Sequence, residues 1–190
     1  MIPAWTMAGV LPPIRPGEQG HSPDRSPYCV ALWMLVDQFS SSTNRIAILK
    51  GLLEYRTALH QLGLIAGFQW LDGSFLEDIE TLESRPPKDV DVVTYFHLPV
   101  GETQATLNAK AGNLFKNAHV KATYSVDAYP YVLGEPVNAR HVKQISYWYS
   151  MWSHRRNGLW KGFIQVDLEP QEDVIAWQAL SGIQAGGTAP

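Results

Sequence analysis

The sequence is poor in cysteine: Cys29 is the only one in 190 residues. One cysteine excludes an internal disulfide and a zinc site built on several cysteines, and it fits a reducing compartment. The six histidines are scattered without the spacing of metal ligands, so we expect no zinc site. Because Cys29 falls in an apolar stretch, we expect it to be a buried and unreactive thiol in a helix.

Long hydrophobic runs are lacking as well. The longest, Tyr28–Val36, has nine residues, whereas a membrane-spanning helix needs about 20. The N-terminus has neither the basic start nor the long apolar stretch of a signal peptide. We therefore expect no membrane association and a cytoplasmic protein.

Charge is scarce and slightly acidic. Charged residues make up 17% of the chain, below the usual share of about 25%. With 15 basic and 18 acidic residues the net charge is −3, which argues against a protein that coats nucleic acid by charge alone. A surface with so little charge favours contact with a partner protein or with a second copy of the chain, and so a homo-oligomer. The sequence contains neither a Walker loop nor a Gly-Xaa-Ser-Xaa-Gly elbow.

The length suits one domain, which we expect over residues 28–182. Residues 1–27 contain six prolines, so they form an arm rather than a long helix or a central strand, with Trp5 and Met7 attaching it to the body. Residues 183–190 are expected to be a flexible tail.

Hydrophobic periodicity predicts alternating helices and strands. Helices are expected from Ser26-Pro27 to about residue 39 and over 44–62, 75–82, 102–116, 136–151 and 173–180. Strands are expected over 65–71, 90–98, 120–133 and 159–168, with Pro130 at a sheet edge or bulge and Asn157-Gly158 as a hairpin turn. In the second helix, Arg56 is expected to lie largely away from the apolar face. This order predicts an α/β or α+β domain built around a mixed sheet.

Two aspartates, Asp89 and Asp91, flank Val90 at the start of the 90–98 strand. Residues two apart in a strand point to the same face, so the two carboxylates lie side by side and repel each other. A divalent cation with hard oxygen ligands, such as Mg²⁺, relieves this repulsion. Asp127 in the next predicted strand reaches the same site if the two strands are neighbours. Three such acids are what two-metal phosphoryl chemistry needs.

Gly73 and Ser74 follow the 65–71 strand. Glycine lets the backbone approach a phosphate closely, and the N-terminus of the helix expected over 75–82 offers free N–H groups and a positive dipole end. Ser74 then serves as the helix cap and as a hydroxyl donor to a phosphate oxygen. We interpret the neighbouring Asp72 as another cap of this short helix.

Taken in order, these motifs resemble the polymerase-β-like nucleotidyltransferase superfamily over residues 65–130. Its pattern is a hydrophobic residue followed by Gly and Ser, a spacer, an Asp–hydrophobic–Asp pair and a third acid on a neighbouring strand. The spacer between Ser74 and Asp89 is at the long end of the pattern. The stretch Tyr147–Lys161 adds a likeness to a small bacterial branch. The resemblance implies a nucleotidyltransferase-like mixed β-sheet flanked by helices.

The resemblance also implies roles for the residues. Asp89, Asp91 and Asp127 would hold Mg²⁺ or Mn²⁺, with Asp127 activating the attacking hydroxyl. Gly73 and Ser74 would hold the triphosphate of an NTP or dNTP. By analogy, the acceptor is a signalling nucleotide, a tRNA or a protein. The setting is bacterial antiphage defence or a toxin–antitoxin pair, where a neighbouring gene encodes a protein partner.

The segment from Tyr147 to Trp160 interleaves aromatic and basic residues. Arg155 and Arg156 could hold phosphates while the aromatic side chains stack on bases. In the alternative interpretation, the aromatics belong to the core and the arginines lie at a solvated hairpin tip. Tyr147 and Met151 then share one helix face toward the core, and Trp148 and Trp152 share a neighbouring one.

Lys161 precedes Gly162 in a strand apolar enough to be buried. A buried ammonium needs an anion, which is either the triphosphate or an internal carboxylate. Asp167, on the same strand, is a weaker alternative for the third acid.

Three functions remain open from the sequence. The first is a metal-dependent nucleotidyltransferase, in which nucleic acid appears only as an acceptor. The second is a non-catalytic protein of the same fold that senses a nucleotide or neutralises a partner. The third is a nucleic-acid-binding module based on Arg155 and Arg156, with structural acids.

Overall fold

The computed structural model describes residues 1–186. The strands are β1 (Tyr28–Cys29), β2 (Gly67–Asp72), β3 (Val90–His97), β4 (Val126–Leu133) and β5 (Ile164–Asp167). The helices are α1 (Leu32–Phe39), α2 (Thr43–Gln61), α3 (Ile79–Glu83), α4 (Gln104–Ala111), α5 (Asn117–Tyr124), α6 (Ala139–Trp152) and α7 (Pro170–Gly186). Two 3₁₀ turns, η1 (Ser74–Leu76) and η2 (Gly112–Phe115), complete the chain. The mixed α/β fold in one domain is confirmed.

The sheet has five strands in the order β1-β5-β2-β3-β4. Strand β2 is antiparallel to both of its neighbours, β3 and β5, whereas β3 and β4 are parallel. Strand β4 is therefore an edge, which agrees with the expectation for Pro130 because proline cannot donate to a further strand.

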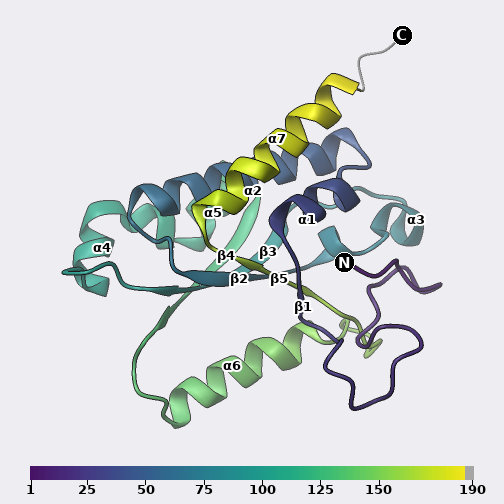
Figure 1. The fold of residues 1–190 in the computed structure, drawn as a ribbon, viewed down its shortest axis with the longest axis horizontal. Coiled ribbons are helices and arrows are strands. Elements are labelled where there is room, and N and C mark those ends of the chain that lie inside the picture. The colour runs from purple at the N-terminus through teal and green to yellow at the C-terminus, as the bar shows by residue number, and fades with distance from the viewer. Residues whose placement is uncertain (187–190) are drawn as a thin grey trace.

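The two faces of the sheet are covered unequally. Figure 1 shows α1, α2, α5 and α7 together on one face and α6 on the other. Alternate side chains of β3 point to opposite faces. Val90 and Val92 are fully buried under the helical layer, while Asp91 points to the face that α6 covers. The acids thus lie on the more open side of the sheet.

Helix α2 is capped by Ser42, whose hydroxyl accepts from the backbone N–H of Arg45 at 3.3 Å. The helix packs so closely on the end of α5 that a Cβ at Gly51 would lie 1.9 Å from the carbonyl oxygen of Tyr124. Glycine at this position therefore allows α5 to rest directly on α2.

Two arginines of α2 are completely buried, which corrects the expectation for Arg56. Its guanidinium donates to Asp173 of α7 at 2.7 Å and to Gln69 of β2 at 2.7 Å. Arg45 donates to Glu80 at 2.7 Å and to the carbonyl oxygen of Phe75 at 2.6 Å. These bonds offset the cost of burying the charges and tie α2 to the sheet, to α7 and to the loop after β2.

The start of the body differs from the prediction. Instead of a helix from Ser26-Pro27, Tyr28–Cys29 forms β1 beside β5, and α1 begins at Leu32. Pairing with a distant strand overrides the local helix-start signal. Cys29 is consequently exposed on a strand and not buried in a helix.

The strand predicted over 120–133 is wrong in its first part. Residues Asn117–Tyr124 form α5, and β4 begins only at Val126. The β-branched and aromatic residues of this segment also fit the buried face of a helix. Val120 is buried, and the ring of Tyr124 lies 5.8 Å from that of Tyr55 on α2.

Other boundaries also move. The helix predicted over 75–82 is divided into η1 and α3. The last helix runs from Pro170 to Gly186 and is therefore longer than the predicted 173–180. A flexible tail from residue 183 is therefore wrong up to Gly186, and the rest of the predicted tail lies outside the described residues. At Asn157-Gly158 the chain makes a tight turn with a single bridge between His154 and Trp160, so neither flank is a full strand.

The N-terminal arm is held by one of the two predicted anchors. The Trp5 indole donates to the carbonyl oxygen of Leu76 at 2.7 Å and packs edge-on against Phe39. Ile2, Val10 and Leu11 add buried contacts, but Met7 is fully exposed. The arm thereby covers the loop that follows β2.

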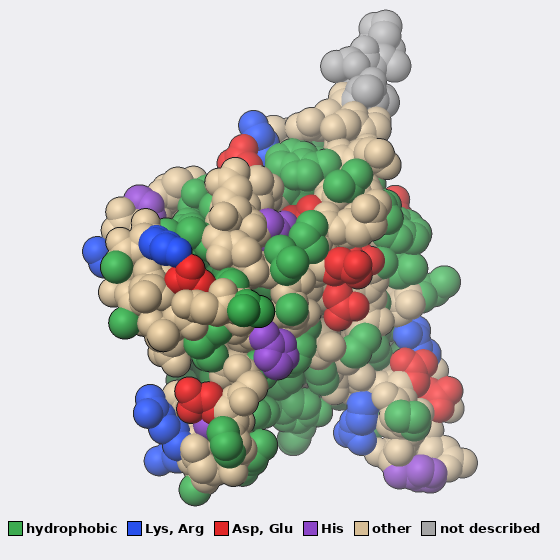
Figure 2. Space-filling view, turned by 60° about the vertical axis from the view of Figure 1, so that its left-hand side comes forward, with side chains coloured by type: hydrophobic (Ala, Val, Ile, Leu, Met, Phe, Trp, Pro, Cys, Tyr) green, Lys and Arg blue, Asp and Glu red, His purple; other side chains and the backbone are tan. Residues whose placement is uncertain are grey.

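The surface mixes side chains of every kind. On the face drawn in Figure 2, basic and acidic side chains lie in small separate groups between exposed hydrophobic ones, with no extended basic area. None of the helices in residues 1–186 has the length and hydrophobicity needed to cross a membrane.

Candidate functional site

Three aspartates stand in one row across three neighbouring strands. Asp72 at the end of β2 pairs in register with Asp91 of β3, and Asp91 pairs with Asp127 of β4. Asp89 directly precedes β3, two residues from Asp91, and so belongs to the same face. The predicted acids lie on adjacent strands, and Asp72 joins them as a fourth acid that sequence reasoning interpreted as a helix cap.

Gly73 brings the turn after β2 against this row. Its φ is +88°, and a Cβ there would lie 2.5 Å from Oδ2 of Asp91. Only glycine accommodates both that backbone conformation and that approach. Ser74 follows in the single turn η1, and no hydrogen bond among the described residues uses its hydroxyl.

The helix N-terminus expected after this turn is weaker than predicted. The element η1 has three residues, Gly73 is its N-cap, and no side chain caps it. A single 3₁₀ turn has little dipole to offer an anion. Because Gly73 and not Ser74 is the N-cap, the predicted capping role of Ser74 is wrong. The hydroxyl of Ser74 remains a free donor at the edge of the acid row.

Lys121 of α5 is the functional residue that sequence reasoning missed. Its ammonium lies 2.9 Å from Oδ2 of Asp89 and 2.6 Å from Oδ2 of Asp127, so it bridges the two. The side chain of Lys121 is 45% exposed and so can swing away. Because residues 120–124 were expected to be a strand, their place beside the acids could not be predicted.

The acids differ in their affinity for protons. Burial, followed by the charges of Asp127 and Asp89, raises the pKa of Asp91 to about 6. Burial also acts to raise the pKa of Asp127, but hydrogen bonds from Lys121 and Asn117 outweigh it and hold that pKa below its usual value. Lys121 pairs with Asp89 and Asp127, whereas none of the ion pairs among the described residues includes Asp91. Of the three predicted metal ligands, Asp91 is therefore the one whose negative charge gains most from a bound cation.

Lys161 is buried, as predicted, and it faces internal carboxylates. Its ammonium lies 2.9 Å from Oδ1 of Asp72 and 3.1 Å from Oε1 of Glu77. Burial acts to lower the pKa of Lys161, but the two carboxylates outweigh it and raise that pKa. Burial raises the pKa of Asp72 to about 7. Glu77 remains a partner of the Lys161 ammonium whether Asp72 is protonated or ionised. The geometry thus favours the carboxylate alternative over the triphosphate.

The two arginines of the hairpin tip are in different positions. Arg155 is paired with Glu83 at 2.6 Å and Glu77 at 3.2 Å. Arg156 is exposed, and none of the ion pairs among the described residues includes it. Arg156 is therefore the basic residue of this pair that is available to an incoming anion.

One cavity of about 750 Å³ joins these groups. It is lined by the acids, by the Gly73-Ser74 turn and by basic side chains, with Met151 and Trp152 from the end of α6. Asp167, the weaker alternative for a third acid, is exposed at the other end of the sheet, in register with Phe68.

The aromatic residues of α6 divide between core and surface. Trp152 is buried, and Trp148 packs on Tyr129 of β4 with ring centroids 4.6 Å apart. Tyr147 is 57% exposed and Met151 37% exposed, so the predicted core face through these two is wrong. The neighbouring stripe through Trp148 and Trp152 faces the sheet, and that part of the prediction is confirmed.

The donor set suits a hard divalent cation. Asp89, Asp91 and Asp127 supply carboxylate oxygens, which Mg²⁺ and Mn²⁺ prefer. Within residues 1–186, no group of three acidic, histidine or cysteine side chains is gathered tightly enough to hold a metal as it stands. The ammonium of Lys121 lies between Asp89 and Asp127, and a cation would have to replace it there.

Comparison with known proteins gives one match. No curated protein and no solved structure matches the chain significantly. One family model covers residues 3–167, which include the arm, the whole sheet and every residue of the cavity. The chain therefore belongs to the family of unknown function DUF6932.

Proposed function

We propose that this protein is a metal-dependent nucleotidyltransferase that moves a nucleoside monophosphate from an NTP or dNTP to a hydroxyl acceptor. The observation that carries the proposal is the register of Asp91 and Asp127 on adjacent parallel strands. The Gly73-Ser74 turn ends the antiparallel neighbour of β3 and opens into the same cavity. This is the order and placement that the resemblance to polymerase-β-like nucleotidyltransferases implies.

The nucleotide would be held from two sides. Asp89, Asp91 and Asp127 would bind Mg²⁺ or Mn²⁺, which neutralises the triphosphate and polarises its α-phosphorus when bound. Ser74 would donate its hydroxyl to a phosphate oxygen, and Arg156 would approach from the hairpin tip. Lys161 and Arg155 act indirectly, because their bonds to Asp72, Glu77 and Glu83 fix the loop that carries the turn.

The transfer would be a displacement of pyrophosphate at the α-phosphorus by the acceptor hydroxyl. The acceptor oxygen forms a bond to the α-phosphorus while the bond from that phosphorus to the bridging oxygen of the β-phosphate breaks, and pyrophosphate leaves. Asp127 accepts the hydrogen bond and then the proton of the attacking hydroxyl. The ammonium of Lys121 must leave Asp127 before this proton transfer, because an ion pair with Lys121 makes the Asp127 carboxylate a weaker base. Positioning and charge neutralisation supply most of the acceleration.

One observation favours a non-catalytic nucleotide sensor instead. Lys121 and Lys161 already pair with three of the four acids, so among these acids Asp91 alone lacks an ion pair in the metal-free protein. Such a protein would bind a nucleotide without turning it over, and its output would be contact with a partner. The nucleic-acid module is disfavoured because Arg155 is paired with Glu77 and Glu83 and the net charge of the chain is −3.

The test is incubation with each labelled NTP and dNTP in Mg²⁺ or Mn²⁺, with mass analysis of all products. Release of pyrophosphate with label in a new product supports the transferase, and Asp91→Asn should abolish it. Asp167→Asn removes a carboxylate on the other end of the sheet and serves as the matched control. Saturable nucleotide binding with no product would select the sensor. The setting we propose, a bacterial defence or toxin–antitoxin pair in the cytoplasm, is tested by co-purification with the product of a neighbouring gene.

A further inference from the structure

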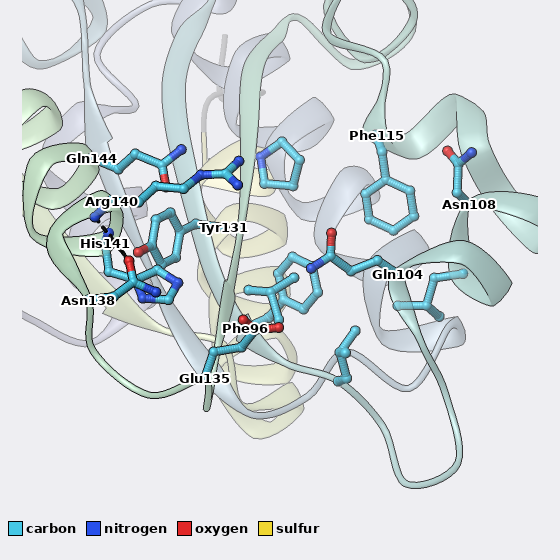
Figure 3. Close-up of a pocket in the computed structure, with 14 residues that line it drawn as sticks. Phe96, Gln104, Asn108, Phe115, Tyr131, Glu135, Asn138, Arg140, His141 and Gln144 are labelled. Atoms are coloured by element: carbon cyan, nitrogen blue, oxygen red, sulfur yellow. Dashed lines mark hydrogen bonds between the residues drawn. The ribbon is translucent and has the colours of Figure 1, made fainter.

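A second cavity, of about 430 Å³, lies at the far end of β3 and β4 from the acids. Figure 3 shows β4 running between its two walls: Asn138, Arg140 and Gln144 belong to the α6 side, and Gln104 and Asn108 belong to α4. The volume falls within the range of about 300–1,000 Å³ that is usual for small-molecule sites. None of the proposed functions of the acids uses this cavity.

Its chemistry is that of a site for a flat, polar, uncharged group. Phe96 and Phe115 supply aromatic surface on the α4 side of β4, and Tyr131 supplies it on the α6 side. Four carboxamide side chains, Gln104, Asn108, Asn138 and Gln144, also line it, and each is both a donor and an acceptor. Arg140 and Glu135 are the charged side chains of the lining, one of each sign, so the cavity does not select for a phosphate.

Most of these polar groups have no internal partner. Asn138 is occupied, because its Oδ1 accepts from the N–H groups of Arg140 and His141 at 2.9 and 3.2 Å. No hydrogen bond among the described residues uses the side chains of Gln104, Asn108 or Gln144. These three carboxamides are therefore free to pair with the edge of a ligand.

The hydroxyl of Tyr131 is the strongest indication of a missing ligand. The residue is 9% exposed, and its hydroxyl is a buried polar atom without a hydrogen-bond partner. Its ring packs on Tyr95 at 5.1 Å and on His141 at 6.0 Å, which holds the ring in place. An unpartnered buried hydroxyl costs about 1–3 kcal/mol in general, so a polar ligand atom beside it is favourable.

The cavity and the acids share one strand. Tyr131 and Asp127 lie on the same face of β4, four residues apart, which at about 3.3 Å per residue is roughly 13 Å. Tyr129, packed on Trp148, lies between them and separates the two cavities. A molecule with a hydroxyl at Asp127 and a flat group at Tyr131 must therefore be long enough to pass around the packed Tyr129–Trp148 pair.

We propose that this cavity binds an unpaired nucleobase of the acceptor. Aromatic faces beside free carboxamides are the usual means by which proteins hold single bases, by stacking and by hydrogen bonds to the base edge. This inference rests on the proposed function, since it assigns the acceptor of the same transfer. The base can come from a free nucleotide or from a single-stranded oligonucleotide, which share this chemistry.

The test is calorimetric titration of the full chain with the common nucleosides, without metal and without triphosphate. The wild type should show saturable binding, and Tyr131→Phe and Gln104→Ala should each weaken it about five- to tenfold. Lys143→Ala, on the same helix as Arg140 but outside the lining, is the control and should bind as the wild type does. Thermal melts should show all variants folded, because Gln104 is exposed and Tyr131→Phe removes only an unpartnered hydroxyl.

A second titration with short single-stranded oligonucleotides separates the two sources of the base. Tighter binding than that of the nucleosides, still sensitive to Tyr131→Phe, identifies a strand. Equal binding identifies a free nucleotide. Asp91→Asn should retain the nucleoside affinity while it loses transfer. Absence of transfer in the wild type with intact base binding would overturn only the proposed function. Absence of saturable nucleoside binding in the wild type, or equal affinity in the wild type and Tyr131→Phe, would overturn the base site.

Discussion

Asp91 of β3 stands directly opposite Asp127 of β4 in the parallel register of the sheet. Asp72 stands opposite Asp91 on the other side. Parallel pairing fixes the two strands over eight residues, so the backbones of the two acids cannot separate without breaking the ladder. The fold therefore holds acids together at a cost, and the predictions below measure that cost and what offsets it.

Asp91→Asn should stabilise the metal-free protein while abolishing transfer. The pKa of Asp91 in the folded state, about 6, is above its ordinary value, so its ionisation opposes folding. At neutral pH the free energy of unfolding should rise by on the order of 2 kcal/mol. Urea unfolding of the variant beside Asp167→Asn measures this. A strongly destabilised variant would show that Asp91 is needed for the structure itself.

The same shift predicts a pH dependence. A carboxyl whose pKa is raised on folding favours the folded state fully below its unfolded pKa, and that contribution is lost as the pH rises through about 6. The stability gap between Asp91→Asn and wild type should therefore be small at about pH 4 and largest above about pH 7. Unfolding curves across this window check it. A gap that does not change with pH would contradict the raised pKa.

Lys121→Met should make the protein less stable without metal and more responsive to it. The variant leaves Asp89 and Asp127 without their shared cation, which costs about 1 kcal/mol for a half-exposed side chain. Mg²⁺ should then raise the melting temperature more than in wild type, since no ammonium has to be displaced. The control is Lys116→Met. The ammonium of Lys116 donates to Asn113 and takes part in none of the ion pairs within residues 1–186. An unchanged response to Mg²⁺ would place the metal elsewhere.

Lys161→Met should destabilise the protein by about 3–5 kcal/mol, because Asp72 and Glu77 lose a buried counter-ion. Adding Asp72→Asn should restore part of this loss, since one of the two uncompensated carboxylates is then neutral. Thermal melts of the single and double variants decide. A single variant that melts normally but loses nucleotide affinity would instead assign Lys161 to the triphosphate.

Gly73→Ala tests the contact between the turn and the acid row. The new Cβ would meet Oδ2 of Asp91, so both the turn and the carboxylate must move. Gly101 has a similar φ of +81° but open space around it, so Gly101→Ala carries the backbone strain without the clash. Only Gly73→Ala should reduce the stabilisation by Mg²⁺ in thermal melts. Equal effects of both variants would reduce the role of Gly73 to its backbone conformation.

The sequence predicted the acid row well because its signals are local. Alternation around Asp89 and Asp91 sets the face of β3, and that pattern needs no knowledge of distant residues. The neighbouring place of Asp127 was an assumption about strand order, and the parallel pairing of β3 and β4 bears it out.

The missed parts depend on distant partners. Lys161 meets Glu77, 84 residues away, and Arg56 meets Asp173, 117 residues away. No local periodicity carries such pairings. Lys121 was hidden for another reason, because Val120 and Tyr124 fit a strand as well as a helix face, and only the contact with α2 decides between them.

The most direct test of the central claim is to locate Mn²⁺ by anomalous diffraction in crystals grown with a non-hydrolysable nucleoside triphosphate. We predict Mn²⁺ bound to carboxylate oxygens of Asp89, Asp91 and Asp127, with the Lys121 ammonium displaced and the triphosphate beside Ser74. A structure in which Lys121 still bridges Asp89 and Asp127, with no Mn²⁺ at these acids under saturating metal and nucleotide, would contradict the account.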